Sequence, residues 1–163
     1  AANELARRLG GGDFQNGASV LNEFCQEHGY ASTHLGREFL ASNPTDDNYT
    51  SASDCCRLLS DIYSGTMVNT NASADMLTLL KAQTRTGKIP SGIPSGVETA
   101  NKTGELSAGD GLGVVENDIA IVFDKEHPYV LCVLSNNIRN NSSAQETIQK
   151  ISADVYQYMT SRK

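Results

Sequence analysis

Long basic and long apolar runs are both missing from this 163-residue chain, and each absence excludes a class of function. No cluster of Lys and Arg is longer than a pair such as Arg7-Arg8, and the net charge is -6 at pH 7. The chain therefore lacks the electrostatic footprint of a nucleic-acid-binding protein. No apolar run approaches the roughly 20 residues that a membrane-spanning helix needs. We expect a globular chain with no nucleic-acid partner, because 39% apolar residues are enough to build a core.

Spacings typical of metal sites are missing as well. No C-x-x-C pair and no H-x-x-x-H pair occurs, so neither a zinc site nor a thioredoxin-type motif is indicated, and we expect no metal and no cofactor. A free thiol packs as a small apolar group, which favours buried free thiols for the four cysteines, with disulfides left open as the alternative. These cysteines are Cys25, Cys55, Cys56 and Cys132.

Periodic apolar residues predict a helical first half. Helices are expected at residues 2–9, at 18–28, from a cap at Thr50 or Ser51 to about Gly65, and at 72–83. Between the second and third helices, residues 30–49 lose this periodicity and gather polar turn residues. This stretch predicts a long surface loop, and loops of this length are often functional.

The second half of the chain predicts a sheet. Residues 88–96, KIPSGIPSG, break every regular pattern and predict a linker, so that residues 1–87 form part of a helical lobe and residues 88–163 part of a sheet lobe. Strands are expected at 97–106, 114–123 and 129–134, with a hairpin loop at the glycine-rich residues 109–113 and antiparallel pairing across the short connections. A last helix is expected to start at Ser142 or Ser143. This order indicates a mixed α/β chain of the α+β type.

The triplet Lys102-Thr103-Gly104 lies in the first predicted strand, inside VETANKTGEL. Lys102 can supply positive potential to a site, and Thr103 can hydrogen-bond a ligand carboxylate. Gly104 lets a ligand lie close against the strand backbone. The triplet alone is a weak signal, because a lysine on an edge strand also discourages aggregation.

The segments around this triplet resemble the later part of the class A β-lactamase-like serine hydrolases. The likeness covers nearly the whole chain and runs, in order, through AANEL, STHLGRE, NYTSASDCCRLL, KIPSGIPSGVETANKTGEL, ENDIAIVF and YVLCVLS. The resemblance implies the β-lactamase/transpeptidase-like fold, in which a helical lobe lies beside an antiparallel sheet and the active site lies between the lobes. It also implies an extracytoplasmic location.

The resemblance assigns roles to the triplet and its neighbour. In this family a serine of an S-x-x-K motif attacks the amide carbonyl, an S-D-N motif lines the cleft, and K-T-G binds the substrate carboxylate. Lys102 is then the electrostatic residue, Thr103 the carboxylate ligand and Gly104 the position of close approach. The backbone N–H of Glu105 is one donor of the oxyanion hole.

The first two motifs are not found in this chain. No S-x-x-K occurs, and the resemblance places S-D-N before Ala1, so we expect the nucleophile to lie upstream and the 163 residues alone to be inactive. Ser135-Asn136-Asn137 fits S-x-N but follows K-T-G, in the wrong order for the family, and is interpreted as a coincidence. We also expect the chain to pair, either with a second copy or with the missing N-terminal segment, because it supplies only part of the family's sheet.

Glu38 is the candidate base for deacylation. β-Lactamases place this glutamate two residues after a loop arginine, as R-W-E, whereas here Glu38 directly follows Arg37. Asn48 stands where the family's loop usually closes with an aspartate that pairs with the arginine. These departures predict slow release of a bound acyl group.

Three functions stay open at this stage, all with a β-lactam or a cell-wall peptide as the bound partner. The first is a β-lactamase-like acyl-serine hydrolase, which needs a positioned base. The second is a D-alanyl-D-alanine peptidase of the penicillin-binding type, which β-lactams trap. The third is a non-catalytic sensor of β-lactams or muropeptides, which needs K-T-G for binding alone.

Overall fold

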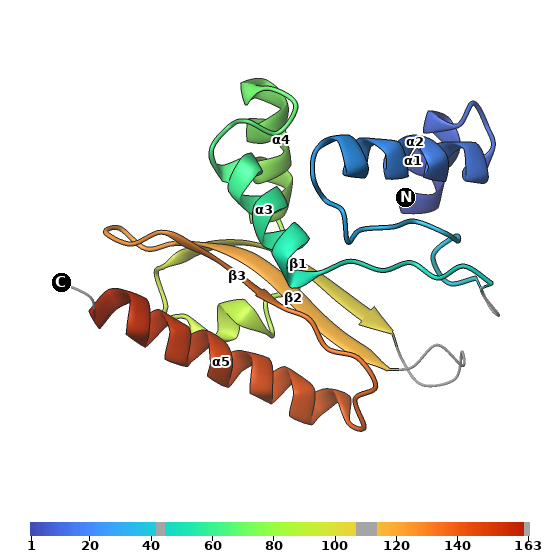
Figure 1. The fold of residues 1–163 in the computed structure, drawn as a ribbon. Coiled ribbons are helices and arrows are strands. Elements are labelled where there is room, and N and C mark those ends of the chain that lie inside the picture. Colours follow the sequence, from blue (N-terminus) through green and yellow to red (C-terminus); the bar gives the residue numbers. More distant parts are fainter. Residues whose placement is uncertain (42–44, 107–113, 162–163) are drawn as a thin grey trace. The chain divides into compact units, whose positions relative to one another are not determined.

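The computed structural model describes residues 1–41, 45–106 and 114–161 (Figure 1). The backbone packs as two compact units, Ala1–Asp54 and a second unit that starts at Cys55. The predicted boundary between the helical and sheet lobes, at residues 87 and 88, stays a prediction. The predicted hairpin loop at residues 109–113 lies outside the described residues. None of the helices among the described residues combines the length and the apolar character that a bilayer crossing requires.

The first unit is built on two crossing helices, α1 (Ala2–Leu9) and α2 (Phe14–Glu27). The prediction for α2 began four residues too late, because the Asp13 side chain caps the helix by accepting a hydrogen bond from the Asn16 N–H at 2.8 Å. Gly17 lies at the crossing, where a Cβ atom would overlap the Ala6 carbonyl, so a larger residue would push the helices apart.

After α2 the chain forms the predicted long loop. Its two ends meet in an isolated bridge between His34 and Tyr49, whose backbone groups exchange hydrogen bonds of 2.9 and 3.1 Å. The ring of His34 stacks on the ring of Tyr49, and its Nε2 lies 2.8 Å from Asp46 Oδ2. The loop therefore has a fixed base within the first unit.

The remaining helices start at side-chain caps. α3 (Ala52–Tyr63) starts after Ser51, whose Oγ accepts from the Asp54 N–H at 3.1 Å, as predicted. α4 (Thr70–Lys81) starts two residues before its predicted position, because Asn69 caps it. α5 (Asn141–Ser161) is capped by Asn140 Oδ1, which accepts from the Ser143 N–H, so the predicted caps Ser142 and Ser143 lie inside the helix.

Among the described residues, the sheet of the second unit has three antiparallel strands in the order β1-β2-β3, which confirms the predicted pairing. The strands are β1 (Glu98–Leu106), β2 (Val115–Phe123) and β3 (Tyr129–Val133). Figure 1 shows α5 along one face of this sheet, and the predicted linker contributes a short 3-10 helix, η1 (Ile89–Gly92), between α5 and the strands. Ile89, Ala120 and Ile148 form the buried core on this face.

Candidate active site

The K-T-G triplet lies on β1, an edge strand of the described sheet. Asn101 and Thr103 are buried and Lys102 between them is exposed, so Lys102 and Gly104 share the face opposite to Thr103. A Cβ atom added at Gly104 would meet only ordinary van der Waals contacts, the nearest at 3.5 Å from Asn117 Cβ. The φ of Gly104 is also not among the positive values found at five other glycines. Neither the backbone nor the packing of the described residues therefore requires a glycine here.

The ammonium of Lys102 remains available on this strand. Its Nζ donates to the backbone carbonyl of the neighbouring Thr103. Among the residues that the structure describes, no carboxylate lies within ion-pair distance of Lys102, whereas Lys81, Arg85 and Lys88 are each paired. An exposed cation without a carboxylate partner can attract an anionic ligand.

Lys88 is the main residue that sequence reasoning missed. It lies in the predicted linker, directly before η1, yet its side chain is only 4% exposed. Its Nζ lies 3.0 Å from Glu105 Oε1 and 2.6 Å from Glu116 Oε2, and it donates to the Asn117 carbonyl at 3.0 Å. Arg85 pairs with the other oxygen of Glu105 at 2.7 Å. The side chain of Glu105 thus bridges two cations, in addition to the backbone role predicted for this residue.

Glu116 connects this cluster to α5. Its side chain is 3% exposed, and its Oε1 accepts hydrogen bonds from Asn141 at 2.8 Å and Gln145 at 3.0 Å. Burial by itself raises the pKa of Glu116, but the hydrogen bonds from Lys88, Asn141 and Gln145 outweigh burial and hold that pKa below its usual value of 4.5. Glu116 is therefore an ionised, buried carboxylate.

Asp118 is a second buried acidic side chain, on the strand that pairs with the triplet. It pairs in register with Thr103, and its oxygens accept from the Asn101 amide at 3.1 Å and the Ile89 N–H at 2.9 Å. Burial raises the pKa of Asp118, and its hydrogen bonds only partly offset this effect. The two acidic side chains of β2 thus tie β1 to η1 and α5. The signal in the sequence was their position: Glu116 and Asp118 lie two residues apart on the strand and share the face of Ala120, which is buried.

We predict that Glu116→Gln changes the pH dependence of stability. The folded pKa of Glu116 is lowered, so its ionised form stabilises the fold above the unfolded value of about 4.5, and this contribution is lost as the pH falls through the folded pKa. The gap in unfolding free energy between wild type and Glu116→Gln should be full at pH 7 and shrink below pH 4.5. Urea unfolding across this range measures the gap. Asp118 is present in both proteins, so its own titration changes both unfolding free energies and largely cancels from their difference.

The matched control is Glu98→Gln, because the Glu98 side chain is 57% exposed in its pair with Lys81. We expect this variant to stay close to wild type at every pH. A Glu116→Gln gap that keeps its size down to acid unfolding would show that the carboxylate charge contributes nothing.

Glu38, the predicted base, lies in the first unit and is held by α1. Its Oε1 forms an ion pair with Arg7 Nη2 at 2.5 Å, and the Asn3 amide lies 3.5 Å from its Oε2. The adjacent backbone is fixed as well, because the Phe39 N–H donates to Asn3 Oδ1 at 2.8 Å. The Glu38 carboxylate is therefore oriented by a cation of α1.

Arg37 has its own carboxylate partner, which the resemblance had placed one residue later. Arg37 Nε lies 2.8 Å from Asp47 Oδ1. Asn48, which stands where the family has the aspartate, instead accepts from the backbone N–H groups of Gly36 and Arg37 at 2.9 and 3.0 Å. The loop thus retains an arginine–aspartate pair through Asp47.

Ser135 has a structural part in the sheet. Its Oγ donates to the Glu116 carbonyl at 2.5 Å, and its backbone N–H donates to Asn117 Oδ1 at 2.6 Å. The hydroxyl thereby extends the contact between β2 and the end of β3. The interpretation of Ser135-Asn136-Asn137 as a coincidence stays a prediction.

The candidate site residues on β1 carry one cation and two neutral donor groups. The described part of the chain contains no group of three or more His, Cys, Asp or Glu side chains that could hold a metal ion. Lys102 supplies positive charge, and the hydroxyl of Thr103 and the backbone N–H of Glu105 are neutral donors. Carboxylates are bound most tightly by this kind of charge-assisted hydrogen bonding.

Comparisons with known proteins bear on the family and the fold. A family model described as the beta-lactamase enzyme family matches residues 1–159. Beta-lactamase 3 of Bacillus cereus is 29% identical over 154 residues, which are 91% of this chain and 45% of that protein. The chain therefore spans about half the length of the curated relative that it matches.

Solved structures share the fold. A beta-lactamase from Sphaerobacter thermophilus superposes with a TM-score of 0.79 at 19% identity, over 91% of this chain and 56% of that one. PBP-A gives 0.69 at 24% identity, over 88% and 52% of the two chains. The TLA-1 extended spectrum beta-lactamase gives 0.73 at 19% identity, over 97% and 64%. These likenesses confirm the predicted β-lactamase/transpeptidase-like fold, and the family model covers nearly every residue. The chain belongs to the beta-lactamase enzyme family.

Proposed function

We propose that this chain is the later part of an acyl-serine hydrolase that opens β-lactam amides through an acyl-enzyme. The observation that carries the proposal is the state of the triplet on β1. Lys102 is exposed and has no carboxylate partner among the described residues, and Gly104 is a glycine that neither packing nor backbone requires. A ligand with a carboxylate, lying along β1, explains both features.

In this proposal the chain supplies the binding half of the site. Lys102 provides positive potential, Thr103 hydrogen-bonds the substrate carboxylate, and the backbone N–H of Glu105 stabilises the oxyanion. The serine nucleophile and its lysine belong to a longer form of the protein, whose location is extracytoplasmic. The predicted pairing with a second copy or with an N-terminal segment stays a prediction.

A penicillin-binding function of the peptidase type is the second candidate, and the position of Glu38 favours it. The Arg7 ion pair holds the Glu38 carboxylate against α1, so the group is not free to act as a mobile base. A PBP-A mutant, which shares this fold, has been solved as an acyl-enzyme complex with penicillin G. Slow release of an acyl group is the behaviour that distinguishes this candidate from an efficient β-lactamase.

We predict that a longer form of the protein, carrying the upstream residues, forms a persistent adduct with penicillin G. Intact mass spectrometry at increasing times after mixing should show a mass gain of one penicillin, followed by slow loss. The purified 163 residues should gain no mass and should not turn over a chromogenic cephalosporin, because the covalent step needs the nucleophile.

Glu38→Gln separates the two candidates in the same assay. We expect its adduct to decay at nearly the wild-type rate, because the wild-type carboxylate is already engaged by Arg7. An adduct that disappears within the mixing time in wild type and accumulates in Glu38→Gln would identify Glu38 as the working base. No adduct on any longer form would refute the acyl-serine proposal.

A further inference from the structure

Two cysteines that the proposed function does not use lie on α3 and on the sheet, Cys56 on the helix and Cys132 on β3. Cys56 on α3 lines a cavity of about 450 Å³ together with Ser60, Tyr63, Ile121 and Val130. The cavity lies inside the second unit, between the helix and the hairpin formed by β2 and β3. Cys56 is only partly buried, so its sulfur is within reach of small molecules that enter the cavity.

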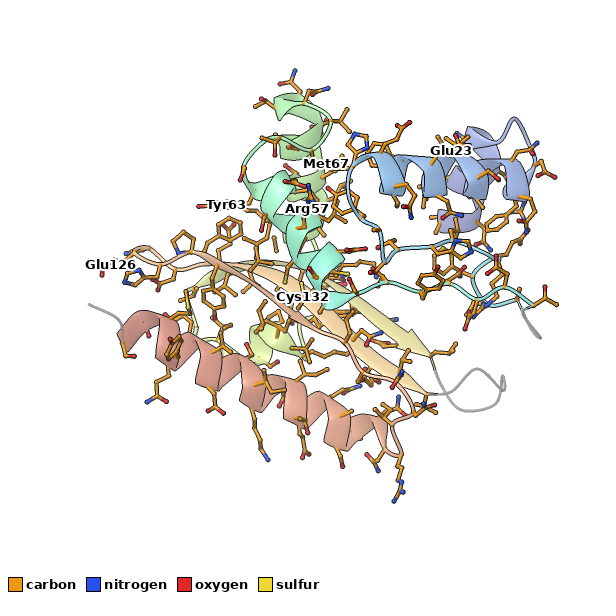
Figure 2. The ribbon with its side chains drawn as sticks, viewed as in Figure 1. Glu23, Arg57, Tyr63, Met67, Glu126 and Cys132 are labelled. Carbon is orange, nitrogen blue, oxygen red and sulfur yellow. The ribbon has the colours of Figure 1, made fainter. Side chains whose placement is uncertain are left out.

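Cys132 reaches the same place from β3. It pairs in register with Ile119, and Val130 pairs with Ile121, so these residues share the face of the sheet that lines the cavity. Cys56 is near enough to Cys132 to raise the pKa of its thiol. Figure 2 shows Cys132 on its strand below the start of α3.

Both sulfurs are reduced in the structure, and their surroundings differ. Burial, and after it the neighbouring thiol of Cys56, raises the pKa of Cys132, so this thiol keeps its proton at neutral pH. Cys56 lines the cavity and is the sulfur that an external reagent meets first. This division of roles is that of an attacking and a resolving cysteine.

We propose that Cys56 and Cys132 are a disulfide-forming pair, which links α3 to β3 when the protein meets a small-molecule disulfide. The inference rests on the placement of the two cysteines and is independent of the proposed hydrolase function. An extracytoplasmic protein meets oxidants of this kind, and disulfides persist in such compartments.

The chemistry balances in two exchange steps. The Cys56 thiolate attacks one sulfur of the oxidant RSSR, forms a mixed disulfide with it and releases one thiol, RSH, after proton uptake. Cys132 then gives its proton to solvent, and its sulfur attacks the Cys56 sulfur and expels the second RSH. Two protein thiols and one RSSR thus become one protein disulfide and two RSH, with the oxidant reduced by two electrons.

The test is oxidation of the folded protein by glutathione disulfide. After acid quenching, alkylation and digestion, mass spectrometry should find one cross-linked peptide that joins Cys56 to Cys132, with the protein two hydrogen masses lighter and two of its four thiols lost. The oxidised protein should unfold at a higher denaturant concentration than the reduced one, and a reducing agent should reverse the shift.

Cysteine variants test which two residues form the disulfide. Cys55→Ser and Cys25→Ser should still form the cross-link, since neither residue is a member of the pair. Cys132→Ser, or Cys132→Ala if the serine variant folds poorly, should stop at a glutathione adduct on Cys56. A cross-link between Cys55 and Cys132, a cross-link between Cys55 and Cys56, or glutathione adducts without any cross-link in wild type would overturn the proposal.

Discussion

Lys88→Met is expected to lower the free energy of unfolding by about 3–5 kcal/mol, the cost of leaving one member of a buried ion pair without its partner. The side chains of Lys88 and Glu116 are 4% and 3% exposed, so water cannot replace the lost ammonium. Urea unfolding at neutral pH measures the change. We expect the unfolding free energy of both proteins to depend on urea concentration with the same slope.

Arg85→Met is the matched control for Lys88→Met. Both cations pair with Glu105, but the Arg85 side chain is 69% exposed. An exposed pair of this kind contributes about 0–1 kcal/mol. If both variants lost the same stability, burial of the charge would not be the cause.

A double variant tests the mechanism of the Lys88 effect. Lys88→Met combined with Glu116→Gln removes the unpaired charge and leaves an amide that can still contact Asn141 and Gln145. We expect this protein to be more stable than Lys88→Met alone, because the two changes couple. Full recovery is not expected, since the bond from Lys88 to the Asn117 carbonyl is also lost. Simple additivity of the two losses would contradict the explanation.

Lys102→Met should have the largest effect on activity. In a longer form of the protein that reacts with penicillin G, we expect the rate constant of acylation to fall by roughly 10²- to 10³-fold, the size of the loss when one electrostatic contact to the transition state is removed. Lys102 is exposed and forms no ion pair among the described residues, so the unfolding free energy should change by less than about 0.5 kcal/mol. Stopped-flow mixing and urea unfolding give the two values.

Lys125→Met is the control for the loss of charge. Lys125 is an exposed residue in the connection between β2 and β3, and its removal changes the net charge by the same amount. Its acylation rate should stay close to wild type. Equal losses in the two variants would mean that overall charge matters and that Lys102 has no specific role at the site.

Local sequence patterns predicted most of the secondary structure. The alternation in VETANKTGEL and ENDIAIVF and the short connection after β2 depend on neighbouring residues only, so the three strands and their antiparallel order were predictable. The starts of α2 and α4 were missed because the helices begin at the caps Asp13 and Asn69, before the apolar periodicity does.

The sequence by itself determined the family likeness, the helix and strand order, and the candidate triplet, because each of these depends on contiguous residues. Tertiary structure alone decided which charges meet. Lys88 stands in a segment without regular pattern, and η1 directs it to Glu116, which lies far along the chain. Likewise, Glu38 in the loop after α2 meets Arg7 on α1, and Cys56 on α3 comes to lie near Cys132 on β3. Such contacts depend on how elements pack and in which register strands pair, and no local spacing in the sequence encodes either.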